Sequence, residues 1–372
     1  MNMPKETLRI LQINLNKSEK AHLELLNNLK GDKWDIVLVQ EPHTTSFSAI
    51  RTPTRFRPVF PGDRGANRSA VRLIIWVSST LMTRDWKILN IPNTNDITAI
   101  QLSSAQGLLT IFNIYNDCTN NNTETALSAY LGAQIDDILP NDQARMIWAG
   151  DFNRHHPLWD RDKDVRLFTP RATRAAEKLL DLVAEHSMAM LLPKGIPTLQ
   201  HMASGRFSRP DNIFGSPALK GSIEKCEVVP QMRPLCMDHF PIETVIRLAQ
   251  TRTATGATRN FRNVDWEQFR KELTTSLGQI PKPAPIASEA QLEQAAANLT
   301  AAIQSIIAVC VKRTKPRPDA KRWWNSDLKE MRKRINRLRS ISYRYRALTT
   351  HTVHQELRAL SNHYGDEIIQ AK

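Results

Sequence analysis

The stretch Arg145 to Asn153, RMIWAGDFN, decides the fold, because an apolar run typical of a buried strand ends there in Gly-Asp-Phe-Asn. A strand that is apolar on both faces belongs inside a sandwich. Side chains two residues apart in a strand point the same way, so Asp151 and Asn153 can share one pocket. Gly, Asp and Asn are also good turn residues, and a plain exit from the strand would use them too. The neighbouring segments must decide between a site and a simple turn.

Short apolar runs of the same kind recur through the first 247 residues, with helical patterns between them. Helical spacing occurs over 19–30 and 173–187. The predicted strands cover residues 8–15, 35–41, 71–77, 108–115, 145–152 and 241–247. Alternation of strands and helices is typical of an α/β domain.

Linker-like composition follows this domain, with small polar residues over 248–263 and a proline-rich run over 281–288. We therefore predict a domain over 1–247, a linker over 248–288 and a mainly helical basic extension over 289–372. Two helices are expected in the extension, over 289–311 and 325–348, and Asn325 or Ser326 can cap the second. Its apolar positions recur every three or four residues, at Leu328, Met331, Ile335, Leu338 and Ile341.

The positive charge is concentrated in this extension. The whole chain has a formal net charge of +14, yet the first 250 residues hold 29 basic against 26 acidic residues, and the remainder 22 against 11. Residues 312–346 alone hold 14 basic and 3 acidic residues. Such a segment favours a polyanion as partner, although basic helices that are merely solvated are common.

Cysteine usage and hydropathy indicate an intracellular protein, nuclear or cytoplasmic. The cysteines Cys118, Cys226, Cys236 and Cys310 lack the C-x-x-C spacing of a zinc site or the density of a secreted scaffold. There is no apolar run long enough to span a bilayer and no apolar core of a signal peptide at the N-terminus. We expect no membrane partner.

Further polar residues stand where predicted strands begin or end. Glu41 ends one strand and is a plausible ligand for a hard cation, and Asp238 and His239 open the last strand. Asp211 can accept a hydrogen bond from that imidazole and fix its tautomer. Asn14 and Tyr115 end two more strands. Asn14 can hold a carboxylate, and Tyr115 can donate to a phosphate oxygen. Each residue taken singly has an ordinary structural explanation, as a turn or a solvated strand end.

Taken together, the order Asn14, Glu41, Tyr115, Gly150-Asp151-Phe152-Asn153, Asp211, Asp238-His239 resembles the endonuclease/exonuclease/phosphatase superfamily. The resemblance spans residues 8–247 and implies a four-layer α/β sandwich, in which helices flank two packed β-sheets. It implies that Glu41, with Asn14 and Asp238, holds Mg²⁺, or Mn²⁺ in its place. Asp151 would activate or position the attacking water, and Asn153 would hold that water or the phosphate. The phosphate-binding groups would be Tyr115 and His239, with His239 oriented by Asp211.

Flanking residues point to one branch of the superfamily. His155-His156-Pro157-Leu158-Trp159 follows the Gly-Asp-Phe-Asn turn, as in endonuclease domains of non-LTR retrotransposons. His155, His156, Trp159 and Ser208 are the predicted substrate contacts, and the alternative for the first three is that they pack a loop. The segment 321–339, KRWWNSDLKEMRKRINRLR, resembles the basic helix that joins endonuclease to reverse transcriptase in those elements.

Some residues depart from the pattern. Met237 stands where retrotransposon members usually carry a small hydroxyl residue, and Asn16 stands where abasic-site nucleases have a carboxylate. Y-x-D-D-type polymerase signatures and zinc knuckles do not occur. The reverse transcriptase to which the extension would lead is therefore absent from this sequence.

The sequence predicts a Mg²⁺-dependent endonuclease that nicks one DNA strand and leaves a 3′-hydroxyl for target-primed reverse transcription. RNA is an additional partner that the basic tail could take. Two alternatives stay open: another phosphodiesterase, phosphatase or repair nuclease of the same superfamily, or a catalytically silent fragment that binds nucleic acid.

Overall fold

The computed structural model describes residues 5–29, 33–46, 49–62, 71–250, 258–259, 261, 264–280, 285–314 and 324–371. The chain divides into two compact units. The first comprises Met1–Ala254 together with Lys321–Lys372, and the second comprises Thr255–Ala320. Among the helices that the structure describes, none is both long and apolar enough to cross a membrane.

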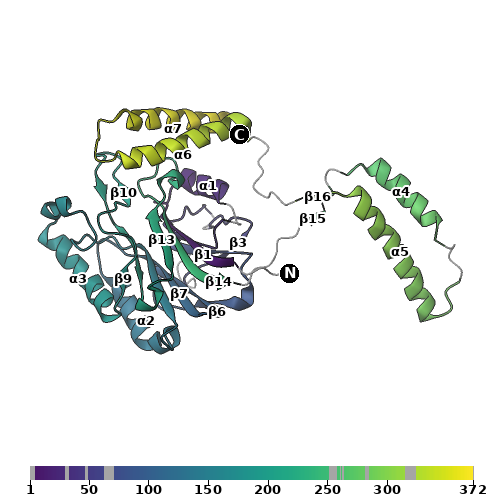
Figure 1. Ribbon diagram of the computed structural model, residues 1–372, viewed down its shortest axis with the longest axis horizontal. Helices are drawn as coiled ribbons and strands as arrows, with labels where there is room; N and C mark the ends of the chain where they lie inside the picture. The colour runs from purple at the N-terminus through teal and green to yellow at the C-terminus, as the bar shows by residue number, and fades with distance from the viewer. Residues whose placement is uncertain are drawn as a thin grey trace. The chain divides into compact units, whose positions relative to one another are not determined.

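The first unit contains two mixed six-stranded sheets (Figure 1). One sheet has the order β13 (Ile223–Val228), β14 (Ile242–Gln250), β1 (Lys5–Asn14), β2 (Ile36–Gln40), β4 (Leu73–Ser78) and β3 (Phe56–Val59). Only β1 and β2 run parallel in it. The predicted strands over 8–15, 35–41, 71–77 and 241–247 correspond to β1, β2, β4 and β14.

The second sheet has the order β5 (Trp86–Leu89), β6 (Ile97–Ser104), β7 (Gly107–Tyr115), β8 (Arg145–Asp151), β12 (Asp211–Gly215) and β9 (Ala189–Met190). Its central strands β7 and β8 are parallel, and β8 pairs with β12 in antiparallel fashion. A two-stranded hairpin, β10 (Leu199–Gln200) and β11 (Phe207–Ser208), stands apart from both sheets. The predicted strands over 108–115 and 145–152 correspond to β7 and β8.

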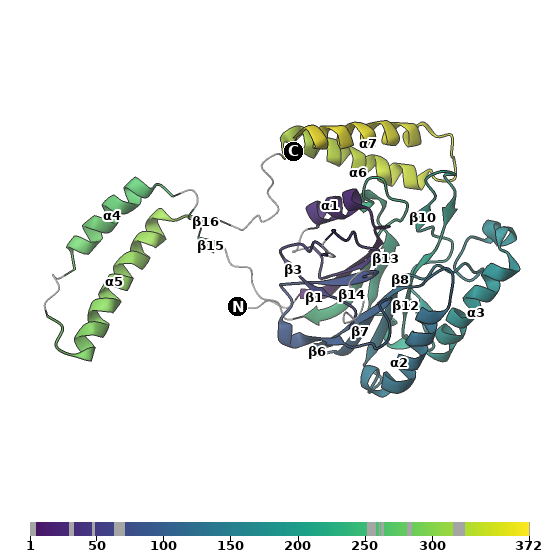
Figure 2. The same ribbon diagram turned by 180° about the vertical axis from the view of Figure 1, so that it is seen from behind.

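Three apolar layers hold these elements together. The inner core lies between the sheets and includes Leu38 and Ile147. A second core packs the helices α2 (Asn122–Ile138) and α3 (Pro170–Glu185) on the outer face of the second sheet. A third packs α1 (Glu19–Asn28) on the outer face of the first. The views in Figures 1 and 2 show the resulting order of helix, sheet, sheet and helix, which confirms the predicted four-layer α/β sandwich.

The inward-facing positions change character along the central strands. At the start of each strand they are apolar, as at Leu8 and Ile10 of β1 or Ile147 and Ala149 of β8. Because inward positions recur every second residue along a strand, the inward residues toward the end of each strand follow from the sequence. They are polar and lie where the parallel strands end: Gln12, Asn14, Gln40, Asn113, Tyr115 and Asp151. The sandwich is therefore apolar through most of its depth and polar at one edge.

The helices α6 (Ser326–Arg344) and α7 (Thr352–Ala371) belong to the first unit. Asn325 caps α6 and accepts a hydrogen bond from the amide of Leu328. Leu328 and Ile335 of α6 are buried with Tyr364 of α7, and Leu235 of the sandwich packs against them. The apolar stripe predicted from helical spacing thus serves to dock this helix pair on the sandwich.

The second unit contains α4 (Trp266–Gly278), α5 (Glu289–Cys310) and a small ladder of β15 (Thr258–Arg259) with β16 (Arg313–Thr314). α4 lies inside the stretch predicted as a linker, where the proline and small residues around it concealed a helix capped by Asp265. The proline-rich run itself lies outside the described residues over 281–284, as does Trp323 of the predicted tryptophan pair. The extension predicted over 289–372 is divided between the two units.

Truncation of Ile335 to alanine tests whether α6 is an integral part of the first unit. Ile335 is fully buried, so Ile335→Ala should lower the free energy of unfolding by about 2–5 kcal/mol. Chemical denaturation, followed by the fluorescence of the buried tryptophans of the sandwich, is the measurement. Leu348→Ala, at a side chain that is 57% exposed, is the control. If Ile335→Ala leaves the unfolding transition of the sandwich unchanged, the docking of α6 on the sandwich is contradicted.

Candidate active site

Strand register places three predicted site residues side by side. Tyr115 is opposite Asp151 in the parallel pair of β7 and β8, and Asp151 is opposite Asp211 in the antiparallel pair of β8 and β12. All three occupy inward positions at the polar edge of the sandwich. Carboxyl ends of parallel strands are where open α/β sheets deliver polar side chains. The sheet pairing alone therefore assembles three of the five predicted catalytic residues.

Gly150 is required by the close approach of β7 and β8. It has a φ of 151°, and a Cβ built on it would lie 1.9 Å from the carbonyl oxygen of Ile114. No other residue fits against backbone at that distance. Asn153 follows in the left-handed region with a φ of 50°, which asparagine tolerates. The Gly-Asp-Phe-Asn turn is thus shaped by its backbone as well as by its side chains.

Asp151 accepts hydrogen bonds from two other predicted residues. Its Oδ2 accepts from Nδ2 of Asn14 at 2.9 Å, and its Oδ1 accepts from the backbone amide of Asn153 at 3.0 Å. The amide side chain of Asn153 points the other way and donates to the carbonyl oxygen of Asn116 at 2.8 Å. Asn14 comes from the first sheet, so its contact with Asp151 joins the two sheets at the site.

His239 lies between two buried carboxylates. Its Nδ1 is 2.9 Å from Oδ2 of Asp211, and its Nε2 is 4.0 Å from Oδ2 of Asp151. A carboxylate can only accept, so Nδ1 carries the proton that is donated to Asp211. The contact expected between Asp211 and His239 is therefore present. Nε2 is left facing Asp151, where a water or a phosphate oxygen can meet both groups.

Both oxygens of Asp211 are engaged within the protein. Oδ2 accepts from His239, and Oδ1 accepts from Nε2 of Gln12 at 3.0 Å. Its backbone amide donates to Oγ1 of Thr198 at 3.1 Å, and the residue is fully buried. Asp211 therefore acts as the fixed partner of the imidazole, in the manner of a carboxylate that orients a histidine.

Burial and charge set the protonation of this group. Burial, reinforced by the negative charge of Asp211, raises the pKa of Asp151 to about 7. Burial alone would lower the pKa of His239, but attraction to Asp211 outweighs it and raises that pKa to about 9. A carboxyl with a pKa near neutrality can take a proton from water, and a protonated imidazole can stabilise a phosphate oxygen.

Glu41 and Tyr115 stand beside this group. Glu41 has a φ of 43°, a strained conformation for a bulky residue and a feature that clusters at functional sites. Its carboxylate is 3.4 Å from Nζ of Lys17. Burial, with the negative charges of Glu41 and Asp151, raises the pKa of Tyr115, so the phenol keeps its proton as a donor. The guanidinium of Arg72 lies 5.4 Å from the centre of the Tyr115 ring.

The turn that carries Asp238 and His239 is tied down by Arg233. Arg233 donates to the carbonyl oxygen of Met237 at 2.6 Å and its guanidinium lies 4.3 Å from the centre of the Phe240 ring. Asp238 accepts a hydrogen bond from the amide of His239 at 3.1 Å, and its charge contributes to the raised pKa of His239. Arg233 was not predicted, because nothing in the sequence separates it from the other arginines.

Carboxylates at this edge suit a divalent cation. Within the described residues, one compact group of potential ligands comprises Asp151, Asp211 and His239, whose donor atoms lie within 4.8 Å of one another. Both oxygens of Asp211 already accept hydrogen bonds, from Gln12 and from His239, which suits an arrangement for proton transfer. Of the predicted metal ligands, Asn14 contacts Asp151, whereas Glu41 and Asp238 lie outside the compact group. The charge of Glu41 acts on Tyr115 and that of Asp238 on His239.

The predicted substrate contacts lie in different environments. Trp159 is buried, and its Nε1 donates to the carbonyl oxygen of Arg154 at 3.0 Å, so it packs the loop and is not available to a substrate here. His155 stacks on Phe168, and His156 accepts a hydrogen bond from the amide of Leu158. Ser208 on β11 is 3.4 Å from a ring nitrogen of His201.

Arg154 is a buried residue that was not predicted from the sequence. It pairs with Glu124 at 2.9 Å and donates to the carbonyl oxygens of Asp117 at 3.1 Å and Asn120 at 2.8 Å. Glu124 in turn accepts from Asn116, whose carbonyl oxygen holds Asn153. The arginine thereby locks the Asn153 turn to the loop after β7. A basic residue directly after a buried turn was the only available signal.

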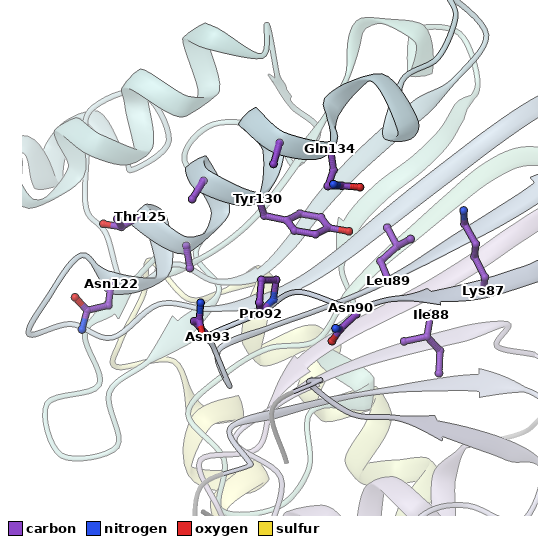
Figure 3. A pocket seen from close by; sticks show the side chains of 13 residues that line it. Lys87, Ile88, Leu89, Asn90, Pro92, Asn93, Asn122, Thr125, Tyr130 and Gln134 are labelled. Carbon is purple, nitrogen blue, oxygen red and sulfur yellow. The ribbon is translucent and has the colours of Figure 1, made fainter. Parts of the chain in front are cut away.

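A surface cleft of about 750 Å³ lies between α2 and the segment around β5 (Figure 3). Tyr130 and Gln134 of α2 face it from one side, and Lys87 and Leu89 of β5 from the other. None of the predicted site residues lines it. The carboxylates and the imidazole are gathered elsewhere, so the chemistry belongs to the polar edge of the sandwich.

Substitution of Asp211 by asparagine tests the electrostatic assignment. Asp211→Asn removes the main influence that raises the pKa of His239, so that pKa should fall well below about 9, although Asp151 and Asp238 remain. The attraction to charged His239 stabilises the fold fully below pH 6.5 and is lost as pH rises through about 9. Asp211→Asn should therefore destabilise the metal-free protein more at pH 6 than at pH 10.

The measurements are an NMR titration of the His239 ring in EDTA and unfolding curves at both pH values. Asp142→Asn, an exposed carboxylate in the loop before β8, serves as the control. An unchanged His239 titration in Asp211→Asn would refute the assigned ion pair.

Known proteins share this architecture. A family model described as "Endonuclease-reverse transcriptase" matches residues 109–243. The endonuclease domain of TRAS1, a telomere-specific non-LTR retrotransposon, is 19% identical with a TM-score of 0.50, over 65% of this chain and 99% of that one. The AP endonuclease LMAP from Leishmania major is 14% identical with a TM-score of 0.53, over 65% and 88%. No curated protein matches the chain. At these identities the solved structures establish a shared fold.

Proposed function

We propose that the chain carries a domain of the endonuclease/exonuclease/phosphatase superfamily and is a metal-dependent endonuclease that nicks one strand of DNA and leaves a 3′-hydroxyl. The observation that carries the proposal is the buried group of Asp151, His239 and Asp211 at the polar edge of the sandwich. Phosphodiester hydrolysis needs an activated water, donors to the non-bridging oxygens and charge neutralisation. Residues of this chain can supply the first two.

Asp151 is the group that accepts the proton of the attacking water. Its raised pKa matches a general base at neutral pH, and the hydrogen bonds from Asn14 and the Asn153 amide hold it in one orientation. His239, kept charged by Asp211, donates through Nε2 to a phosphate oxygen. Tyr115, with its phenolic proton retained, is a second donor on the same side.

Glu41, with Asn14 and Asp238, would hold the divalent cation, for which we propose Mg²⁺ with Mn²⁺ as a substitute. The donor set fits a hard cation, because it consists of two carboxylates and an amide oxygen. When bound, the ion would neutralise charge that develops on the phosphate. Glu41 has a strained φ of 43°, and strain of this kind clusters at functional sites, which supports this role.

DNA is the proposed substrate on three grounds. The matched family is described as endonuclease-reverse transcriptase, one structural neighbour is the endonuclease domain of a retrotransposon, and the chain carries a net charge of +14. The leaving 3′-hydroxyl would prime reverse transcription in a longer protein of this type. Binding of RNA by the basic residues of the extension is part of the same proposal.

A repair nuclease is the second candidate, favoured by the likeness to the AP endonuclease LMAP. Asn16 counts against it, because abasic-site nucleases resemble one another in carrying a carboxylate at this position. The two candidates differ in substrate: an abasic-site enzyme acts on damaged duplex, whereas a retrotransposon-type enzyme acts on intact DNA.

Nicking of intact supercoiled plasmid is the deciding measurement. The full chain with Mg²⁺ should convert supercoiled to open-circular DNA, and EDTA should abolish the reaction. Asp151→Asn removes the base and should lower the rate at least ~100-fold. Asp142→Asn, the exposed control, should nick at the rate of the unchanged protein.

The product ends distinguish the alternatives. Extension of the nick by a DNA polymerase without prior treatment demonstrates a 3′-hydroxyl. Cleavage confined to a duplex with an abasic site would transfer the assignment to the repair branch. Binding without cleavage of either DNA would leave the fold with a silent site.

A further inference from the structure

The basic residues of α6 divide between two faces of the helix, except Arg334, which pairs with Glu356 of α7 at 2.9 Å. Arg339 is buried and Arg332 is half-buried. Lys329, Lys333 and Arg337 are exposed, as is Arg344 at the end of the helix. One face contacts the sandwich and the other faces solvent, so the residues of each face can be substituted separately.

The inward face fixes α6 on the sandwich by polar contacts as well as apolar ones. Arg339 lies 3.4 Å from Oε1 of Glu24 on α1, and both side chains are nearly inaccessible. Arg332 donates to Oδ1 of Asn28 at 2.8 Å, one turn further along α1. A buried ion pair of this kind holds one geometry, because either charge left alone would be strongly destabilising.

The C-terminal end of α6 reaches the strand entry that carries His239. The ring of Tyr343 packs against Phe240 with 4.8 Å between ring centres, and its hydroxyl donates to the carbonyl oxygen of Pro197 at 2.7 Å. Phe240 directly follows His239 in the sequence. Figure 2 shows α6 passing over α1 toward β10, within the same unit. The orientation of α6 relative to the active site is therefore set by direct packing.

The outward residues Lys329, Lys333, Arg337 and Arg344 form what we call the α6 basic stripe. At 3.6 residues per turn they fall within an arc of about 80°, and from first to last they span about 22 Å of helix. Lys333 contacts Glu330 at 2.7 Å in an exposed pair of little energetic value. For the other three, the described part of the chain places no carboxylate at ion-pair distance. The stripe has no evident structural purpose.

We propose that the α6 basic stripe binds the phosphate backbone of the same DNA duplex whose phosphodiester enters the active site. The inference rests on the proposed function and adds a defined surface to it. Duplex DNA carries one charge per ~1.7 Å of axis, so a stripe of about 22 Å can follow the phosphates over roughly two-thirds of a turn. Because α6 packs on Phe240, which directly follows His239, bound duplex is held in a fixed relation to the catalytic group.

Neutralisation of the stripe in the full chain tests this. The variant Lys329→Gln, Lys333→Gln, Arg337→Gln, Arg344→Gln leaves the inward residues intact. Its affinity for a duplex of about 25 base pairs, measured by fluorescence anisotropy in EDTA, should fall at least ~10-fold at physiological salt. The slope of log K against log salt should become shallower by about 0.9 for each phosphate that the variant no longer neutralises. In Mg²⁺, nicking should show a raised KM with little change in kcat.

A matched control removes the same charge from the opposite end of the strands. Arg84, Lys87, Lys220 and Arg247 are exposed and lie on elements remote from the ends of β1 and β8. Substitution of these four by glutamine should leave duplex affinity and KM within about two-fold of the unchanged protein. Circular dichroism and melting temperature verify that both variants are folded.

The outcomes separate this proposal from the nuclease assignment, because binding is measured without cleavage. Equal losses of affinity in the stripe and control variants would overturn the stripe as a specific surface. Loss of single-stranded RNA binding with duplex binding intact would assign the stripe to RNA and overturn the proposal. If neither protein nicks while only the stripe variant loses duplex binding, the stripe stands and the nuclease function falls.

Discussion

The structure depends on one constraint: two carboxylates, Asp151 and Asp211, are buried between two β-sheets and must be compensated there. Isolated buried charges are costly, and these are met by His239 and by amides from the facing sheet. Gln12 donates to Asp211 and Asn14 donates to Asp151, so both hydrogen bonds cross between the sheets. The same hydrogen bonds that make burial tolerable also aim the carboxylates and the imidazole.

Contacts farther from the two carboxylates hold the segments of the site in place. Arg154 and Glu124 form a buried ion pair that holds the Asn153 turn to the loop after β7. Arg233 holds the turn before His239. Tyr343 of α6 then packs on Phe240, which links the basic helix to the segment before β14 that carries the imidazole. A helix that the charge pattern suggests is an appendage is in this way part of the domain that surrounds the site.

Local patterns predicted the elements at the centre of the fold well, because the buried central strands are apolar through most of their length. The runs ending in Glu41, Tyr115 and Asp151 are of this kind. Patterns were less informative for short edge strands and for α4, whose flanking residues resemble a linker. Trp159 shows a different limit: a motif next to the site suggested contact with substrate, yet its indole fills the core beside α3. The sequence alone does not distinguish an aromatic residue that packs in the core from one that contacts a substrate.

The sequence by itself determined that polar residues end the buried strands, and that Asp151 and Asn153 belong to one turn, because spacing along a strand is a local property. It also determined where the positive charge is concentrated. Only the tertiary structure decided which polar groups meet, since Gln12 and Asp211 are 199 residues apart and come together through the stacking of two sheets. It likewise decided which arginines of α6 are buried and which face solvent, because that depends on the surface against which the helix packs.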